Sequence, residues 1–91
     1  MDNLDLLLRE LNKAVESKEP IYCSVMKTGC LNLYSKVYPT KISYDGWLCI
    51  GCKDDEFLNF NADDYSLHFD NTEGIPHFAF RKRDEYIGIC F

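Results

Sequence analysis

Cys49 and Cys52 are separated by two residues, which is the spacing that lets two thiolates bind zinc or close a small redox-active disulfide ring. A zinc site needs a second pair of ligands, and the remaining cysteines and histidines contain no other short-spaced pair. Redox chemistry needs the first cysteine at the start of a helix, whereas the local pattern predicts a strand. Side chains at this spacing on a strand point to opposite faces unless Gly51 marks a bulge. We therefore expect reduced cysteines and no bound metal or other cofactor.

Oxygen-bearing side chains at alternate positions, Asn59, Asn61 and Asp63, are followed by Asp70, and this spacing resembles that of a calcium-binding loop. Asp64 stands where the sharp turn of such a loop needs glycine, and Asp70 replaces the glutamate that normally binds calcium through both oxygens. The apolar residues around Asn59 also predict a strand rather than the helix that enters such a loop. The sequence therefore does not predict a calcium site.

The two histidines, His68 and His77, are the candidate general bases of the chain. Neither is accompanied by a glycine-framed serine, a paired-histidine motif or a glycine-rich phosphate loop. His68 alternates with Leu67 and Phe69, so we expect it on the outward face of a strand. Because the sequence assembles no active site, we expect a protein without enzymatic activity.

Acidic residues are concentrated in residues 54–73, which contain no lysine or arginine and have a formal charge of −7, whereas the whole chain has −5. These acids are Asp54, Asp55, Glu56, Asp63, Asp64, Asp70 and Glu73. Such a segment repels the phosphates of nucleic acids and attracts basic protein surfaces, because charge steers an encounter before any contact forms. We therefore expect a basic protein partner, without direct nucleic-acid or membrane binding. The alternative is a solvated face that keeps a small protein soluble.

Aromatic residues supply the second component of a protein-binding face, because tyrosine and tryptophan combine a large contact area with little side-chain entropy. Tyr65 directly follows two of the acids, whereas Trp47 follows a predicted turn and is expected in the core. The two groups of acids should lie at the ends of a short strand, residues 57–61, about 20–25 Å apart at ~3.3 Å per residue. The residues predicted to contact a partner are Asp54, Asp55, Glu56, Asp63, Asp64 and Tyr65.

A helix is predicted from about residue 3 to about residue 18, because apolar side chains recur there at helical spacing. These side chains are Leu4, Leu7, Leu8, Leu11, Ala14 and Val15. Asp2 or Asn3 can accept hydrogen bonds from the free amides of the first turn, and Pro20 cannot continue the helix. One face of the helix should therefore pack on a core.

Beyond Pro20 the pattern changes to period two, with β-branched and aromatic residues between turn residues. Asp45-Gly46 is a dipeptide that fits a type I′ hairpin turn. Short connections favour antiparallel neighbours, because a parallel crossover needs about a dozen residues or more. The sequence thus predicts an α+β protein of one domain, residues 1–91, in which an N-terminal helix precedes an antiparallel β-meander or small barrel at residues 20–91. The predicted strands are residues 21–26, 30–37, 41–44, 47–52, 57–61, 65–69, 77–82 and 86–91.

From the end of the predicted helix to residue 66 the predicted elements contain, in order, the segments LNKAVESKEP, IYCSV, VYP, DGWLCIG and EFLNFNADDYS. This pattern resembles the WYL-domain family of small SH3/Sm-like barrels, which are often fused to bacterial transcription regulators. The resemblance implies an SH3/Sm-like barrel with a ligand-sensing or regulatory role. The sequence differs from the family where Trp47 is followed by Leu48 without an intervening tyrosine. The family's basic residues in the closing strand are also replaced, so its ligand site is not carried over; the residues present are Asn59, Asp63 and Asp64.

The chain has 91 residues, of which 46% are hydrophobic, and this is enough for one small core. No run approaches ~18 consecutive apolar residues, so we expect neither a membrane span nor a secretory segment. The five cysteines cannot all pair and are too few for a disulfide scaffold, which favours a cytoplasmic location. Together these features predict an acidic, non-enzymatic protein-binding domain, an inhibitor of the immunity or phage anti-defence type, directed at a basic nucleic-acid-handling protein such as a nuclease. The alternative is a stand-alone WYL-like ligand-sensing or regulatory adaptor.

Overall fold

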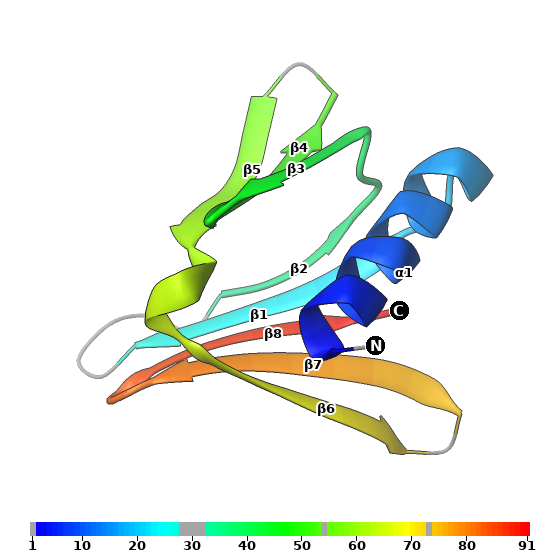
Figure 1. Ribbon diagram of the computed structural model, residues 1–91. Coiled ribbons are helices and arrows are strands. Elements are labelled where there is room, and N and C mark those ends of the chain that lie inside the picture. Colours follow the sequence, from blue (N-terminus) through cyan, green and yellow to red (C-terminus); the bar gives the residue numbers. More distant parts are fainter. Residues whose placement is uncertain (1, 28–32, 54, 73) are drawn as a thin grey trace.

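The computed structural model describes residues 2–27, 33–53, 55–72 and 74–91. Within these ranges the chain forms one α-helix, α1 (Asn3–Ser17), one short 3-10 helix, η1 (Ala62–Asp64), and eight antiparallel strands in two sheets (Figure 1). The strands are β1 (Ile21–Lys27), β2 (Leu33–Val37), β3 (Lys41–Asp45), β4 (Trp47–Cys52), β5 (Asp55–Asn61), β6 (Ser66–Thr72), β7 (Ile75–Lys82) and β8 (Glu85–Cys90). One sheet has the order β2-β1-β8-β7-β6 and the other has the order β3-β4-β5. The predicted α+β class, with a helix preceding antiparallel strands, is confirmed.

α1 begins and ends where local chemistry favours it. The Asp2 side chain accepts a hydrogen bond from the backbone N–H of Asp5 at 2.8 Å, which satisfies one free amide of the first turn. The helix ends at Ser17, one residue earlier than predicted, and Lys18 caps it in the left-handed conformation, with φ 57°. The buried residues of α1 are Leu7, Leu11 and Ala14. The apolar face of the helix therefore packs on the core as predicted.

The first and last strands of the chain lie side by side (Figure 1). β1 pairs with β8 from Tyr22 opposite Cys90 to Lys27 opposite Glu85. After β2 the chain leaves this sheet, forms the three-stranded sheet, and returns through η1 to β6. The strands therefore do not form one continuous meander, because the β1–β8 pair joins segments from the two ends of the described chain.

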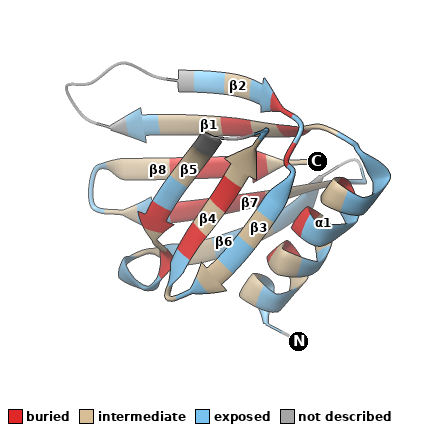
Figure 2. Cartoon of the chain, turned by 90° about the horizontal axis from the view of Figure 1, so that it is seen from above, coloured by how far each residue is buried: buried red, intermediate tan, exposed pale blue. Residues whose placement is uncertain are grey.

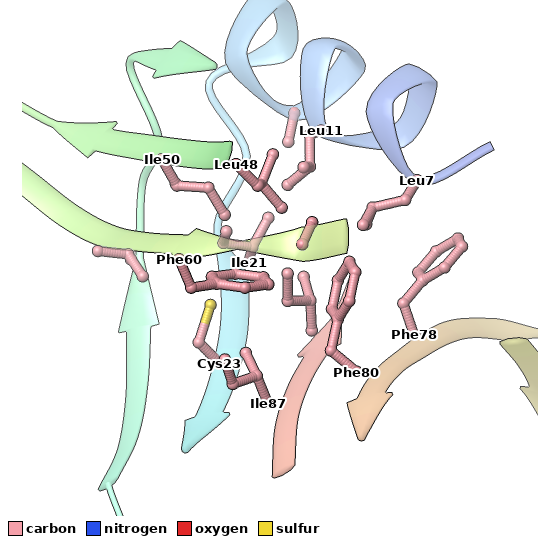
Figure 3. Packing of buried hydrophobic residues seen from close by; sticks show 14 residues of the cluster. Leu7, Leu11, Ile21, Cys23, Leu48, Ile50, Phe60, Phe78, Phe80 and Ile87 are labelled. Carbon is pink, nitrogen blue, oxygen red and sulfur yellow. The ribbon is translucent and has the colours of Figure 1, made fainter. Parts of the chain in front are cut away.

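The core lies between the two sheets, and Figure 2 shows the three-stranded sheet lying over the five-stranded one, with α1 beside β3. α1 contacts β3 and β6, so it covers the side of the core between one edge of each sheet. Phe80 of β7 packs edge-to-face on Phe60 of β5, with ring centroids 4.9 Å apart, and this contact joins the sheets (Figure 3). The largest fully buried side chains are Phe78, Phe80, Leu7, Leu11, Ile21, Leu48, Ile50, Ile89 and Cys23.

The β3–β4 hairpin forms as predicted, but its turn differs. Asp45 is paired with Trp47, so only Gly46 lies between the two strands. Gly46 has φ 71°, whereas Asp45 does not have a positive φ. A type I′ turn needs positive φ at both central residues, so the predicted turn type is wrong.

Most strand bounds differ from the prediction by one to three residues, and only β4 matches it at both ends. Residues 30–32 of the strand predicted at residues 30–37 lie outside the described residues, and β2 covers the rest. β5 begins at Asp55, two residues earlier than predicted, because Asp55 and Glu56 pair with the end of β4.

Among the described helices, none has the length and apolar character needed to cross a membrane.

Candidate functional site

The predicted partner-binding acids lie in two groups at the two ends of β5. Asp55 and Glu56 are the first residues of the strand, although their side chains, like the whole of Asp54, lie outside the part of the structure that is described. Asp63 and Asp64 lie in η1, directly after the strand ends. The separation of the two groups along one strand is therefore as predicted, and the second group can be described atom by atom.

Two hydrogen bonds hold η1 against the β3–β4 hairpin, and a third caps η1 itself. The Tyr44 hydroxyl donates to Asp63 Oδ1 at 2.9 Å, and Ala62 N–H donates to the Gly46 carbonyl at 2.9 Å. The Asn61 side chain accepts from Asp63 N–H at 3.2 Å, which caps the short helix. A Cβ on Gly46 would lie 3.1 Å from Asp63 Oδ2, so glycine permits this close approach as well as the positive φ.

Further carboxylates gather around the Tyr44 hydroxyl. The hydrogen bond to Asp63, partial desolvation, and the charges of Asp63, Asp2 and Asp45 together raise the pKa of the Tyr44 phenol. Asp2 caps α1 and Asp45 ends β3, so three separate elements bring acids to one place. The sequence did not indicate that Asp2 and Asp45 belong to this group of acids. Each of them already had a local role, Asp2 as the helix cap and Asp45 as a turn residue.

Trp47 is 54% exposed, and the expectation that it lies in the core is wrong. Leu48 and Ile50 are fully buried, and side chains alternate along a strand, so Trp47 points to the outer face of the three-stranded sheet. The register places Asp45 opposite Trp47 on one side and Asn61 opposite it on the other. We call this end of the molecule the acidic tip; it consists of Asp2, Asp45, Trp47, Asp63 and Asp64.

Asp64 and Tyr65, which were predicted to face a partner, both have contacts inside the chain. Lys82 Nζ lies 3.6 Å from Asp64 Oδ2 and 5.5 Å from the centroid of the Tyr65 ring. The Tyr65 ring packs on Phe60 at 5.4 Å between centroids, and its hydroxyl donates to Glu85 Oε2 at 2.7 Å. Tyr65 is therefore half-buried, and Trp47 presents the more exposed aromatic surface of the acidic tip.

The Tyr65 phenol should make the stability of the fold fall with rising pH in the alkaline range. Partial burial and then the hydrogen bond to Glu85 raise its pKa from 10.0 to about 12. A raised folded-state pKa contributes stability that is complete below pH 10 and is lost as the pH rises through 12. Tyr65→Phe should therefore flatten the fall of the unfolding free energy between pH 10 and pH 12, measured by urea unfolding.

Tyr34→Phe is the control for this titration, because the Tyr34 side chain is 72% exposed. It should leave the alkaline slope as it is in the original protein. An equal slope for the Tyr65→Phe and Tyr34→Phe variants would contradict the assignment of the raised pKa to Tyr65.

The Cys49-Cys52 pair is divided between the two faces of β4. The Cys49 thiol donates to Asn59 Oδ1 at 3.4 Å on the outer face, whereas Cys52 packs against the core. A register shift does occur at Gly51, but the pairing of Ile50 with Leu58 and of Gly51 with Glu56 puts the extra residue in β5. β4 therefore keeps its alternation, and the two thiols are not brought together.

Burial makes the thiols of Cys23 and Cys90 harder to ionise. Burial, with a smaller effect of Cys90, raises the pKa of Cys23 to about 12. Desolvation also raises the pKa of Cys90. Cys30 lies outside the described residues.

The outer face of the five-stranded sheet holds a row of side-chain types that sequence spacing could not reveal. Asp70, His77 and Cys90 occupy neighbouring register positions on β6, β7 and β8. His77 Nε2 lies 3.0 Å from the Tyr86 hydroxyl, and Gly88 allows the Tyr86 ring to lie across the sheet. Burial raises the pKa of the Cys90 thiol, and the ring nitrogen of His77 is engaged by the Tyr86 hydroxyl.

Metal-ligating side chains are not clustered in the part of the chain that is described. No group of three or more histidines, cysteines or acids there has the geometry to hold a metal ion. The calcium-like spacing is also dispersed, because Asn59 lies on β5 of one sheet and Asp70 on β6 of the other.

A small pocket of about 150 Å³ lies beside Tyr65, over the paired ends of β1 and β8. Its lining residues are Val25, Met26, Tyr65, Glu85 and Ile87. Sites for drug-sized ligands usually have volumes of about 300–1,000 Å³. The acidic tip is therefore a better candidate for the functional site than this pocket.

Comparison with known proteins identifies no similar protein. No protein-family model matches the chain, and the searches of curated proteins and of solved structures find no match.

Proposed function

We propose that this protein is a non-enzymatic protein-binding domain that docks its acidic tip on a basic surface of a partner. The observation that carries the proposal is Trp47, a large aromatic side chain left 54% exposed and directly opposite Asp45 on the neighbouring strand. The proposed partner is a nucleic-acid-handling protein such as a nuclease, and the proposed role is inhibition, as in immunity or phage anti-defence proteins.

The charge of the tip supports a basic protein as partner. Asp45, Asp63 and Asp64 are exposed, and only Asp64 is seen next to a lysine within the described tip. Carboxylates in such an arrangement attract cationic surfaces over about 8–10 Å at physiological ionic strength and repel nucleic-acid phosphates. A protein cleft that binds nucleic acid has the charge that this tip complements, and a domain seated on it would block that cleft.

The combination of charge and indole suits a tight contact better than charge alone. Exposed charges chiefly accelerate association, whereas large aromatic residues at the centre of an interface supply most of the binding energy. Trp47 lies between Asp45 and Asn61 in the register, so a polar rim surrounds an apolar centre.

The charge component is tested by capture of the partner from a lysate of the native host, identification by mass spectrometry, and binding kinetics with the purified partner. Asp45→Asn combined with Asp63→Asn removes two charges, and the amide at residue 63 can still accept the Tyr44 hydrogen bond. We expect association to slow about fivefold or more at low salt and the difference to shrink at high salt.

The matched control is Glu16→Gln combined with Glu19→Gln, which removes the same charge from exposed residues at the other end of α1. It should change association less than about twofold. Equal slowing by both double variants would contradict docking through the tip, and a partner with an acidic binding surface would contradict the proposed partner class.

The WYL-like adaptor stays a second proposal, supported by the pocket beside Tyr65. A metabolite that co-purifies with the protein and protects it against heat, together with no captured protein, would favour this second proposal.

A further inference from the structure

We infer that the acidic tip receives an arginine side chain of the partner, with the guanidinium stacked on the Trp47 indole and paired with the Asp45 carboxylate. This inference rests on the proposed docking function and names the chemical group that is recognised. The proposed contact lies on the outer face of the three-stranded sheet, at the end where β3 turns into β4.

The backbone register places the required groups next to one another. Asp45 and Asn61 are the residues opposite Trp47 on the two neighbouring strands. Side chains at opposite positions of antiparallel strands have Cβ atoms about 4.5–5.5 Å apart and share one face. The Asn61 side chain is held by Asp63 N–H at 3.2 Å. A flat cation lying on the indole would therefore meet a carboxylate at one edge of the ring.

Three tyrosine rings of the protein show the same kind of contact made internally. Lys36 lies 5.7 Å from the Tyr38 centroid, Arg81 lies 5.7 Å from that of Tyr86, and Lys82 lies 5.5 Å from that of Tyr65. Among the described residues no such cation lies over Trp47, although the indole is the strongest cation-binding ring among the side chains. An external cation is the complement of this exposed ring and its carboxylates.

Arginine fits this arrangement better than lysine. The guanidinium is planar and weakly hydrated, so it stacks on an aromatic ring while its N–H groups donate in parallel to both oxygens of a carboxylate. The lysine ammonium is a compact and strongly hydrated charge that cannot do both at once. Charge attraction alone, by contrast, would bind the two cations equally.

Trp47 is the only tryptophan of the chain, so its fluorescence reports directly on this contact. The probes are a tetra-arginine peptide and a tetra-lysine peptide, titrated at low salt into the protein of residues 1–91 under excitation that is selective for tryptophan. We expect the arginine peptide to change the fluorescence and to bind at least about fivefold more tightly than the lysine peptide.

The variants separate the carboxylate from the general charge of the protein. Asp45→Asn should weaken binding of the arginine peptide at least about fivefold, because the amide has no charge and only one oxygen that can accept from the guanidinium. Glu16→Gln makes the same charge change on an exposed residue of α1 and should weaken it less than about twofold.

Equal affinity for the two peptides, or equal weakening by Asp45→Asn and Glu16→Gln, would overturn the arginine inference. Either result would leave the proposed docking function standing, because that function is tested with the captured partner and the double variants. Absence of any fluorescence change, when the captured partner itself binds, would also overturn the arginine inference alone.

Discussion

Phe80→Ala should destabilise the protein by about 3–5 kcal/mol, which is the largest stability effect that we expect for a single substitution. Phe80 is 1% exposed, and its ring contacts Phe60 at 4.9 Å and Tyr65 at 6.3 Å between centroids. The substitution removes the contact that joins the two sheets and leaves a cavity that the surrounding strands cannot close completely. Urea unfolding followed by circular dichroism at neutral pH measures the loss.

Tyr34→Ala is the matched control, because it removes an aromatic ring that is 72% exposed and should cost less than about 1 kcal/mol. A double-mutant cycle with Phe60→Ala isolates the contact between the rings, and we expect a coupling of about 0.5–1.5 kcal/mol. A loss below about 1 kcal/mol for Phe80→Ala would contradict the packing of the two sheets through this pair.

The elements of the fold could be predicted because their signals are local. The apolar stripe of α1 and the alternation along each strand follow from side-chain periodicity, and these signals gave the helix and the eight strands with small errors at their ends. The β3–β4 hairpin was predicted from Asp45-Gly46, although Gly46 alone supplies the positive φ. Local patterns thus determined which segments are strands.

The assembly of the strands could not be predicted in the same way. The pairing of β1 with β8 joins Tyr22 to Cys90, and no periodicity relates residues so far apart. The packing of the two sheets is also non-local, because it brings Phe60 of β5 against Phe80 of β7 across the core. Such contacts are set by the burial of apolar surface in the whole chain rather than by neighbouring residues.

The candidate site was predicted in part. Acid composition singled out Asp63 and Asp64 but not Asp45, which was read as a turn residue, or Asp2, whose charge acts on Tyr44 only when α1 packs beside β3. The position of Trp47 could have been derived from the sequence, since Leu48 is apolar and alternation puts its neighbour on the opposite face.

Trp47→Ala should accelerate dissociation of the captured partner about 30-fold or more, equivalent to about 2 kcal/mol of binding free energy. A half-exposed indole gains most by being covered, because its apolar surface leaves water and its face meets a cation of the partner. Association should change little, since the carboxylates of the tip remain in place. The substitution should also leave the fold intact, because Leu48 and Ile50 rather than Trp47 hold β4 to the core.

The control for this substitution is Tyr34→Ala, which deletes an even more exposed aromatic side chain on β2 of the other sheet. In binding kinetics with the immobilised partner, the Tyr34→Ala variant should dissociate at the rate of the original protein, within about twofold. If Trp47→Ala and Tyr34→Ala dissociate at the same rate, the indole is not the anchor. If only Tyr34→Ala dissociates faster, the partner docks on the five-stranded sheet instead of the acidic tip. We expect the Trp47→Ala variant to dissociate faster but to associate with the salt dependence of the original protein. This result would separate two roles at the acidic tip, because the carboxylates would steer the encounter and Trp47 would stabilise the complex.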